Sequence, residues 1–458
     1  MAGGTAFALG IEGGEVVDPR GRRRANVYVD DGRIAEVTAE TRPARERVDA
    51  GGLMVMPGMV DAHVHFMDPG DPDREDFRTG TAAAARAGVT TVVEHTHASP
   101  VISAADLAAK REHVAGRARV DYALGAHAWP DRLDEVEGVW DAGVAFVKAF
   151  TCTTHGVPGF DAAHLHALLR RTAECGATVL VHCEDESLTS QAEGALRGCG
   201  REDGGIIPAW RSREAEIVSL SILGALTRLT GARAIAAHVS HPDALALLER
   251  ERDAGAGLRI ESCPQYLSLL EDEVLEHGAF RKFTPPARAR DQRELDAMWE
   301  AVAAGTIDFV SSDHAPATAA QKRAGSIWDV HFGLPGVDTT LSVLLDGAAA
   351  GRISYERVVA AYAEGPAIAY GLHPAKGSLS PGADADVLLV DPAERWTVDA
   401  RDIHSKAGWS PFAGRTLTGR TVRTYLRGVP AADGGRVLAE PGTGRFLPGA
   451  GGRADGAD

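Results

Sequence analysis

The chain has 458 residues, 44% of them hydrophobic and 24% charged, a balance typical of a globular protein with one large domain or two unequal domains. Its 48 basic and 64 acidic side chains give a formal charge of −16, which argues against nucleic-acid backbones and anionic membrane surfaces as partners. No stretch approaches the roughly 20 apolar residues of a membrane span, and we expect no targeting segment. Five cysteines, an odd and sparse set, indicate reduced thiols in a cytoplasmic protein.

Short strands separated by glycine-containing turns are predicted for residues 5–56. Such a layer is too small to enclose a core of its own. Similar strand patterns return near the C-terminus, at residues 387–390 and 421–426. We therefore expect residues 1–56 and 373–447 to form one discontinuous domain made of β strands from both termini. Residues 448–458 are rich in Gly, Ala and Asp, which predicts a disordered tail.

Residues 57–372 alternate between apolar strand-like runs and helical patterns, which predicts an α/β fold. Eight such runs favour a closed, parallel (β/α)8 barrel of the TIM type, and this would be the catalytic domain. The expected strands are 59–64, 89–93, 120–126, 144–149, 178–181, 234–237, 258–261 and 307–311. Clear helical patterns cover 104–115, 162–175, 212–229 and 292–304.

Residues able to bind metal lie where these strands end. His63 and His65 are one residue apart in a strand, so both imidazoles point the same way and can share an ion. Barrels of this kind build active sites at the C-terminal strand ends. Taken singly, His182 and His238 have an alternative as hydrogen-bonded structural histidines, and Asp313 has one as a helix cap. The full set is His63, His65, Lys148, His182, His238 and Asp313.

Lys148 is the least expected member of this set, because apolar residues flank it on both sides. A reference pKa near 10.4 leaves only about one amine in 2,500 neutral at pH 7, and a cationic lysine cannot bind a metal. A neutral amine in a desolvated pocket can add carbon dioxide, and the resulting carbamate acts as a bidentate carboxylate between two cations. The alternative is a lysine paired with an acidic neighbour.

These residues stand in motifs that closely resemble the cyclic amidohydrolases, the branch of the amidohydrolase superfamily that holds allantoinase, hydantoinase (dihydropyrimidinase) and dihydroorotase. The resemblance covers residues 5–447 approximately, and so many motifs in this order are highly specific. The motifs are Pro57-Gly58-Met59-Val60-Asp61-Ala62-His63-Val64-His65, Val147-Lys148-Ala149-Phe150, His182-Cys183-Glu184, His238-Val239-Ser240, Glu261-Ser262-Cys263-Pro264-Gln265-Tyr266-Leu267, Thr284-Pro285-Pro286 and Ser312-Asp313-His314.

The resemblance implies two divalent metal ions, zinc by preference, in a barrel flanked by a β-sandwich. By match, His63, His65, carboxylated Lys148 and Asp313 would hold the more buried ion. Lys148, His182 and His238 would hold the other. We expect a hydroxide bridging the two metals to attack the ring amide carbon, while Asp313 passes the proton to the leaving nitrogen. The partner would be a small cyclic amide, and we expect a homo-oligomer of two or four chains.

The substrate ring is predicted from a few positions at which the enzymes of this branch differ from one another. Dihydroorotases typically carry Arg where this chain has Met67 and Asn where it has His97, which argues against dihydroorotase. Hydantoinases usually carry Tyr where this chain has Thr153, the residue that allantoinase-like sequences tend to show. Gln265 favours the hydantoinases instead. Allantoin and another cyclic ureide or imide therefore both remain candidates. The predicted substrate-binding residues are Met67, His97, Thr153 and Cys263.

Further histidines accompany the predicted second and third strands. His95 and His97 either project into the barrel mouth as hydrogen-bond donors to substrate or form a loop pair facing solvent. We assign His127 and His155 to packing or loops. Two other classes of function stay open: a mononuclear deaminase, which has no use for Lys148, and a non-catalytic scaffold, which all six intact ligand positions disfavour.

Overall fold

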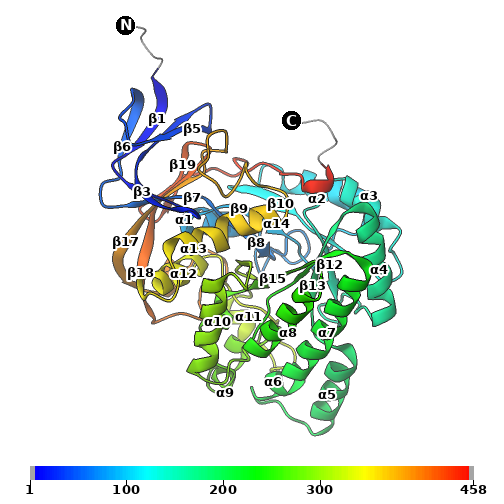
Figure 1. The fold of residues 1–458 in the computed structure, drawn as a ribbon. Coiled ribbons are helices and arrows are strands. Elements are labelled where there is room, and N and C mark those ends of the chain that lie inside the picture. Colours follow the sequence, from blue (N-terminus) through cyan, green and yellow to red (C-terminus); the bar gives the residue numbers. More distant parts are fainter. Residues whose placement is uncertain (1–5, 453–458) are drawn as a thin grey trace.

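Parallel strands surrounded by helices form the larger part of the molecule (Figure 1). The computed structural model describes residues 6–452. Strands occupy all eight predicted positions of the barrel region, and consecutive strands pair in parallel. They are β8 (Met59–Val64), β9 (Val89–Glu94), β10 (Asp121–Leu124) with β11 (Ala126–His127), β12 (Val147–Phe150), β13 (Thr178–His182), β14 (Arg233–Ala236), β15 (Leu258–Ser262) and β16 (Phe309–Val310).

The third position is divided at Gly125, so that β10 pairs with β9 and β11 pairs with β12. A Cβ atom at residue 125 would lie 2.5 Å from the ring of Phe146, which explains why a glycine stands at this break. The last and first strands meet through a parallel bridge between Val64 and His314, where the His65 amide donates to the His314 carbonyl at 2.7 Å.

The helices follow the strands and begin at polar caps. Side chains of Ser103, Asp161, Ser212 and Asp291 accept backbone N–H groups at the starts of the four helices that the pattern predicted most clearly. Those helices are α2 (Ala104–Val114), α4 (Ala162–Cys175), α7 (Arg213–Thr230) and α10 (Gln292–Ala304). The others are α1 (Phe77–Ala87), α3 (Glu135–Asp141), α5 (Glu186–Gly198), α6 (Ile206–Trp210), α8 (Pro242–Asp253), α9 (Glu273–His277), α11 (Ala319–Lys322), α12 (Thr340–Ala349), α13 (Tyr355–Val359) and α14 (Gly365–Ala369).

Two further sheets lie beside the barrel, and one of them contains strands from both ends of the chain. In Figure 1 the blue N-terminal strands lie beside the orange C-terminal ones, because β17 pairs with β7 on one side and with β18 on the other. The larger sheet has the order β20 (Arg436–Val437), β19 (Val429–Asp433), β18 (Thr416–Leu426), β17 (Val387–Thr397), β7 (Met54–Pro57), β2 (Glu15–Asp18) and β3 (Gly21–Arg24). The smaller has the order β5 (Arg33–Thr38), β4 (Asn26–Asp30), β1 (Phe7–Glu12) and β6 (Ala44–Asp49).

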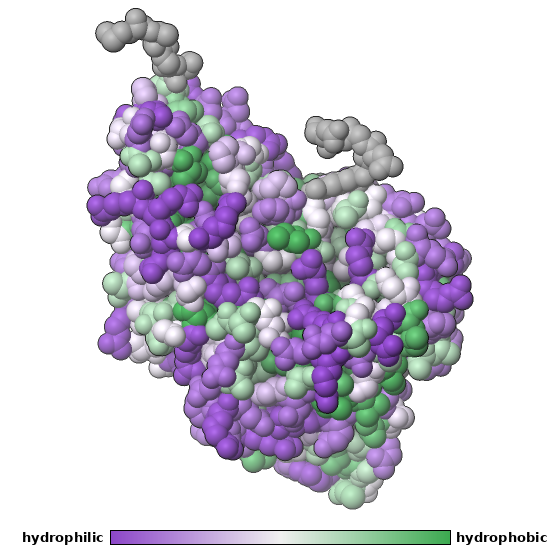
Figure 2. Space-filling view, in the orientation of Figure 1, coloured by the Kyte–Doolittle hydropathy of each residue, from purple (hydrophilic) through white to green (hydrophobic). Residues whose placement is uncertain are grey.

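Apolar side chains form four separate clusters within residues 6–452, and three of them build the barrel and the terminal sheets. Val60, Ala62 and Val93 belong to a cluster inside the barrel, while a larger cluster joins the outer faces of the strands to the helices. A third cluster contains side chains of both terminal sheets, among them Ile11 and Leu389. Hydrophilic residues cover most of the visible surface (Figure 2), and no helix within residues 6–452 is both long and apolar enough to cross a membrane.

Residues 448–452 differ from the expected disordered tail, whereas 453–458 lie outside the described residues. The Gly449 amide donates to the Gly143 carbonyl at 2.9 Å, and residues 450–452 form a short 3-10 turn that contacts α3. Glycines allow this close approach, since a Cβ at residue 449 would lie 2.2 Å from the Val144 carbonyl. Composition alone suggested disorder, but backbone hydrogen bonds to the barrel hold this part in place.

A buried ionic cluster joins the barrel to the terminal sheets. Lys376 Nζ lies 2.5 Å from a carboxylate oxygen of Asp121 on β10 and 2.9 Å from Asp384 and Asp386, which precede β17. The Lys376 side chain is 1% exposed. Although burial lowers the pKa of an amine, the charges of Asp386 and Asp121 raise the pKa of Lys376 above its usual value, so it stays charged.

Replacing this lysine tests how strongly the cluster stabilises the fold. Lys376→Met leaves buried carboxylates with too little positive charge, and we expect the free energy of unfolding to fall by about 3–5 kcal/mol. Denaturant unfolding followed by circular dichroism measures the change. Arg293→Ala, which removes an ion pair from a side chain that is 91% exposed, serves as the control and should leave the transition unchanged. Equal stability of Lys376→Met and the parent protein would contradict the stabilising role of Lys376.

Candidate metal centre

One cavity collects all six residues that the sequence pattern singled out as metal ligands. It opens at the C-terminal ends of the barrel strands, because His63 lies on β8, Lys148 on β12 and His182 at the end of β13. His238 and Asp313 follow β14 and β16, and both adopt the left-handed backbone conformation, with φ of 40° and 48°. Such a conformation is unfavourable for a non-glycine residue and is concentrated at functional sites. The other lining residues are His65, His97, Phe150, His155, Thr284, Ala315, Phe332 and Gly333.

The first histidine pair converges on Asp313. The Nε2 atoms of His63 and His65 each lie 3.3 Å from Asp313 Oδ1. Their other ring nitrogens are fixed from outside the pair: His63 Nδ1 lies 2.9 Å from Glu261 Oε2, and His65 Nδ1 lies 3.0 Å from the His95 carbonyl oxygen. A carboxylate or carbonyl on Nδ1 leaves the Nε2 lone pair directed into the cavity.

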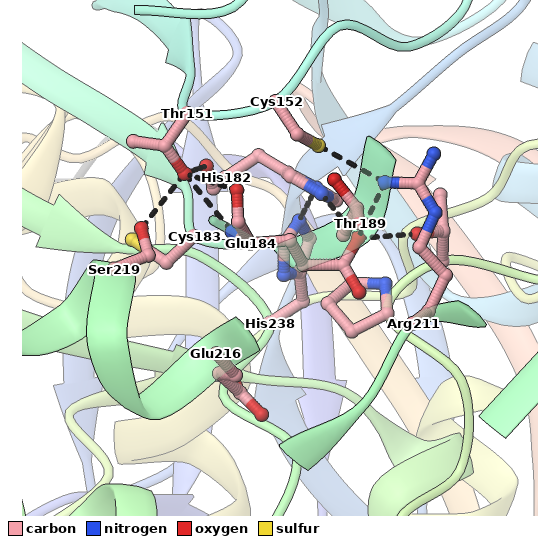
Figure 3. Close-up of polar contacts among 12 residues, drawn as sticks. Thr151, Cys152, His182, Cys183, Glu184, Thr189, Arg211, Glu216, Ser219 and His238 are labelled. Atoms are coloured by element: carbon pink, nitrogen blue, oxygen red, sulfur yellow. Dashed lines mark hydrogen bonds and ion pairs between the residues drawn. The ribbon is translucent and has the colours of Figure 1, made fainter. Parts of the chain in front are cut away.

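In the second histidine pair, the outer nitrogen of His182 is held in a similar way (Figure 3). His182 Nδ1 and His238 Nε2 lie only 3.0 Å apart, and His182 Nε2 lies 2.8 Å from Glu184 Oε2. Because Glu184 accepts the proton on Nε2, the lone pair of His182 is on Nδ1 and faces His238. Two imidazole nitrogens that meet at this distance suit a shared metal ion.

Glu184 belongs to a buried ionic network that also contains two arginines. Arg288 Nη2 lies 2.6 Å from Glu184 Oε1 and Arg211 Nη1 lies 3.3 Å from Oε2, while Thr284 donates its hydroxyl to Oε2 at 2.6 Å. Burial alone would raise the pKa of Glu184, but the charge of Arg211 and the hydrogen bond from His182 hold it well below its usual range. The carboxylate is therefore ionised and accepts a hydrogen bond from His182.

Lys148 has no hydrogen-bond partner for its amine within residues 6–452, although the side chain is 1% exposed. The ring centroid of Phe150 lies 5.2 Å from Nζ. Burial lowers the pKa of Lys148 to about 8, against the opposing charges of Glu261 and Asp313. The amine is thus much closer to neutrality at physiological pH than an exposed lysine, and no carboxylate within that range pairs with it at salt-bridge distance.

The protonation states of the other members suit metal binding. Burial, with the nearby charge of His63 or His182, holds the pKa of His65 and of His238 well below its usual value, so both imidazoles are neutral. Burial raises the pKa of Asp313, which favours a carboxylate able to take up a proton. Neutral imidazole, carboxylate and a deprotonated amine derivative are the forms in which these side chains bind divalent cations.

This donor set fits a pair of divalent ions. Nitrogen and oxygen ligands from two histidine pairs and Asp313 meet in one cavity, the outer nitrogens of three histidines are already oriented, and the Lys148 amine lacks any other partner. A second close set, Cys152, His182 and Glu184, suits a cation less well, because Arg211 contacts both Cys152 and Glu184.

One of the four predicted substrate-binding residues lines the cavity, and the other three lie elsewhere. His97 lines the cavity, where its ring stacks on His155 with centroids 4.2 Å apart. Three others are absent from the lining. Met67 is buried and its sulfur lies 3.3 Å from Thr96 Oγ1, Thr153 is exposed on a loop, and Cys263 packs in the core between strands and helices. Alternation along β15 would place Cys263 on the same side as Glu261, but β15 ends at Ser262, and Cys263 beyond it joins the outer core.

Several site residues were missed at the sequence level. His155, assigned to packing or a loop, lines the cavity and adopts a positive φ of 53°. The motifs contain Glu261 and Glu184 but indicate no role for them, whereas in the structure they orient His63 and His182. A signal existed for both glutamates, since each is a charged residue in or just after an apolar strand.

A barrel with two histidine pairs, an aspartate and a buried lysine at its strand ends is typical of metal-dependent hydrolases. The sequence model of the amidohydrolase family matches residues 54–430. The chain belongs to the amidohydrolase family.

Named relatives match over nearly the whole chain. An allantoinase from Rubrobacter xylanophilus is 36% identical, with 97% of this chain and 98% of that protein covered. An L-hydantoinase from Paenarthrobacter aurescens is 33% identical, with 96% and 98% covered, and a dihydroorotase from Halobacterium salinarum is 34% identical, with 90% and 96% covered. The solved L-hydantoinase from Arthrobacter aurescens superposes with a TM-score of 0.92 at 32% identity, covering 96% and 100%. These matches confirm the predicted resemblance to the cyclic amidohydrolases and the α/β fold.

Glu261 offers a test of how the first histidine pair is oriented. Glu261→Gln removes the charge that holds His63 Nδ1–H, so we expect metal affinity to fall by about 10- to 100-fold. Competition with a chromophoric chelator measures the affinity. Glu271→Gln removes a carboxylate near Arg290 that contacts none of the six residues, and it should bind metal like the parent. Equal affinities of the two variants would contradict the role of Glu261.

Proposed function

We propose that this protein is a metal-dependent hydrolase that opens the ring of a cyclic amide, with an allantoin-like ureide as the preferred substrate class. The observation that carries the proposal is the convergence of two histidine pairs, Asp313 and an unpartnered Lys148 in one cavity. The relatives support the reaction class, because those that match over at least nine-tenths of this chain bear the names of cyclic amide hydrolases.

The residues would divide between two ions. His63, His65 and Asp313 would hold one, His182 and His238 the other, and Lys148 would contact both. For that role the neutral Lys148 nitrogen bonds to the carbon of carbon dioxide and gives up one proton, which leaves a carbamate with a single negative charge. When bound, the ions would polarise the ring carbonyl and lower the pKa of a water molecule.

Asp313 would move the proton. Its Oδ1 lies 3.3 Å from the Nε2 atom of each histidine of the first pair, and the side chain lines the cavity. Because burial raises its pKa, the Asp313 carboxylate would accept a proton from the attacking water more readily than an exposed aspartate, and it would then pass that proton to the leaving ring nitrogen. The neutral imidazole of His65 beside it has no second ring proton to compete in this transfer.

The cavity lining favours an uncharged ring. Within the described residues the lining contains no arginine, and Lys148 is its one lysine. A substrate carboxylate would therefore lack a cationic side chain to bind it, which disfavours dihydroorotate. His97 and His155 would instead present neutral imidazoles to the carbonyl and amide groups of a ureide.

A hydantoin is the second candidate substrate. The L-hydantoinase structure, with a TM-score of 0.92, and Gln265 in the sequence favour it. For the architecture we propose a closed barrel over residues 57–372 and a β-sandwich built from 1–56 and 373–447, supported by the Val64–His314 bridge and the pairing of β17 with β7. A cytoplasmic location, zinc as the native metal and an oligomer of two or four chains stay predictions.

Metal analysis combined with a hydrolysis assay tests the function. We expect two divalent ions per chain and chelator-sensitive ring opening of allantoin, hydantoin, dihydrouracil or a cyclic imide. Asp313→Asn should keep metal and lose at least about 100-fold in kcat, because proton transfer is removed. Lys148→Ala should lose at least one of the two ions, and with it the activity. Asp253→Asn, an exposed aspartate on α8, is the matched control. A fully active Lys148→Ala protein would refute the carbamate, and activity without metal would refute the mechanism.

The stacked pair at the mouth of the cavity should govern substrate choice. His97→Ala removes one hydrogen-bonding wall, and we expect the ratio of kcat/KM between allantoin and unsubstituted hydantoin to change by about 10-fold or more, since each lost hydrogen bond to substrate weighs about 1–2 kcal/mol. His166→Ala, on the exposed face of α4, is the control. An unchanged ratio across the panel would remove His97 from the substrate site.

A further inference from the structure

A fifth buried imidazole lies against the first histidine pair. His95 directly follows β9, its amide donates to the Val64 carbonyl at 3.1 Å, and its side chain is 1% exposed. The ring centroid of His95 lies 4.3 Å from that of His65 and 4.6 Å from that of His63. His63 and His65 are themselves 5.3 Å apart. His95 is therefore nearer to each of them than they are to each other.

Neither ring nitrogen of His95 has a hydrogen-bond partner within residues 6–452. The contrast with His63, His65 and His182 is sharp, because each of those has an outer nitrogen held by a carboxylate or carbonyl. Buried polar groups in native proteins are nearly always partnered by protein, water or an ion. A buried imidazole with two free nitrogens therefore points to a ligand that protein atoms do not supply.

The free nitrogens are placed where such a ligand is expected. One ring nitrogen of His95 and one from each of His63 and His65 all lie within 4.8 Å of one another. Packing alone does not account for a histidine here, because the neighbouring interior residues Val93 and Phe146 are apolar, with the Phe146 ring edge-on at 5.0 Å. Three imidazole nitrogens gathered in this way form a donor set suited to a borderline-soft divalent cation.

His127 provides an internal comparison. It is equally buried, and both its ring nitrogens also lack partners among the described residues. Its ring stacks on Phe150 and lies 5.7 Å from His95, and it is not part of the three-histidine set. Burial without a partner is therefore shared by both residues, but only His95 reaches the first histidine pair.

We propose that His95 is a third imidazole ligand of the ion held by His63 and His65. The inference rests on the proposed function, which supplies that ion. It predicts that the two ions differ in their dependence on Lys148: the ion on His63, His65 and His95 keeps three protein nitrogens when the carbamate is absent, whereas the ion on His182 and His238 keeps two. The first ion then stays bound before Lys148 is carboxylated, and the second binds only afterwards.

Metal content of purified, dialysed variants tests this assignment. With Zn²⁺ or Co²⁺ as the probe, the parent protein should hold two ions per chain and Lys148→Ala should hold one. Adding His95→Leu to Lys148→Ala should remove that remaining ion, while adding His127→Leu should leave it. Circular dichroism and melting midpoints establish that the variants are folded. The double variant with His95→Leu should also release Co²⁺ to a chelator at least tenfold faster than the double variant with His127→Leu.

A second measurement needs no change at Lys148. In the parent protein loaded with Co²⁺, each ligating imidazole gives one strongly shifted exchangeable N–H proton resonance, so we expect five such signals, and four in His95→Leu. Three results would overturn the assignment of His95. They are four signals in the parent protein, one ion retained by the double variant of Lys148→Ala and His95→Leu, and loss of both ions from Lys148→Ala. If the parent protein still binds two ions when one of these results is found, the proposed function is unaffected. If the parent protein binds no ion, both the proposed function and the assignment of His95 are wrong.

Discussion

The metal centre depends on one interaction that recurs at three of its histidines: one ring nitrogen of His63, His65 and His182 is held by a fixed acceptor. A neutral imidazole can carry its proton on either of two distinct ring nitrogens, and a neighbouring acceptor selects one of them. Glu261, the His95 carbonyl and Glu184 make that choice for His63, His65 and His182. Glu261 also accepts the His238 amide at 3.2 Å, so one carboxylate holds parts of both histidine pairs. Without these acceptors the lone pairs would not converge.

Placing such acceptors in the interior requires compensation elsewhere. A buried carboxylate is costly unless positive charge and hydrogen bonds surround it. Glu184 and Glu216 are balanced by Arg211 and Arg288, all within 3% exposure, and Arg288 Nη1 lies 2.6 Å from Glu216 Oε2. The network is neutral as a whole and reaches from the cavity wall into α7 and the segment before α10. Through Glu184 the network contacts His182, a member of the second histidine pair.

The environment of Lys148 is the opposite of that of Glu184 and Glu216, because its buried amine is not paired with an opposite charge among the described residues. No carboxylate pairs with its amine among the described residues, and burial lowers its pKa to about 8. By contrast, the equally buried Lys376 contacts three aspartates and stays charged. The same side chain therefore has a reactive role in the cavity and a structural role between the barrel and the terminal sheets, and the number of acidic neighbours makes the difference.

The sequence by itself determined the strand positions, the four best helices and the six residues at the strand ends, because hydrophobic periodicity, helix caps and ligand spacing are local properties. It also predicted the cyclic amidohydrolase resemblance, since the motifs are contiguous. Tertiary structure alone decided which side chains meet. Met67, Thr153 and Cys263 do not line the cavity, whereas His155 lines it and Glu184 and Glu261 contact its histidines. Likewise, backbone contacts dock residues 448–452, whose composition suggested disorder. These outcomes depend on backbone direction and on contacts between residues far apart in the chain, which no local pattern encodes.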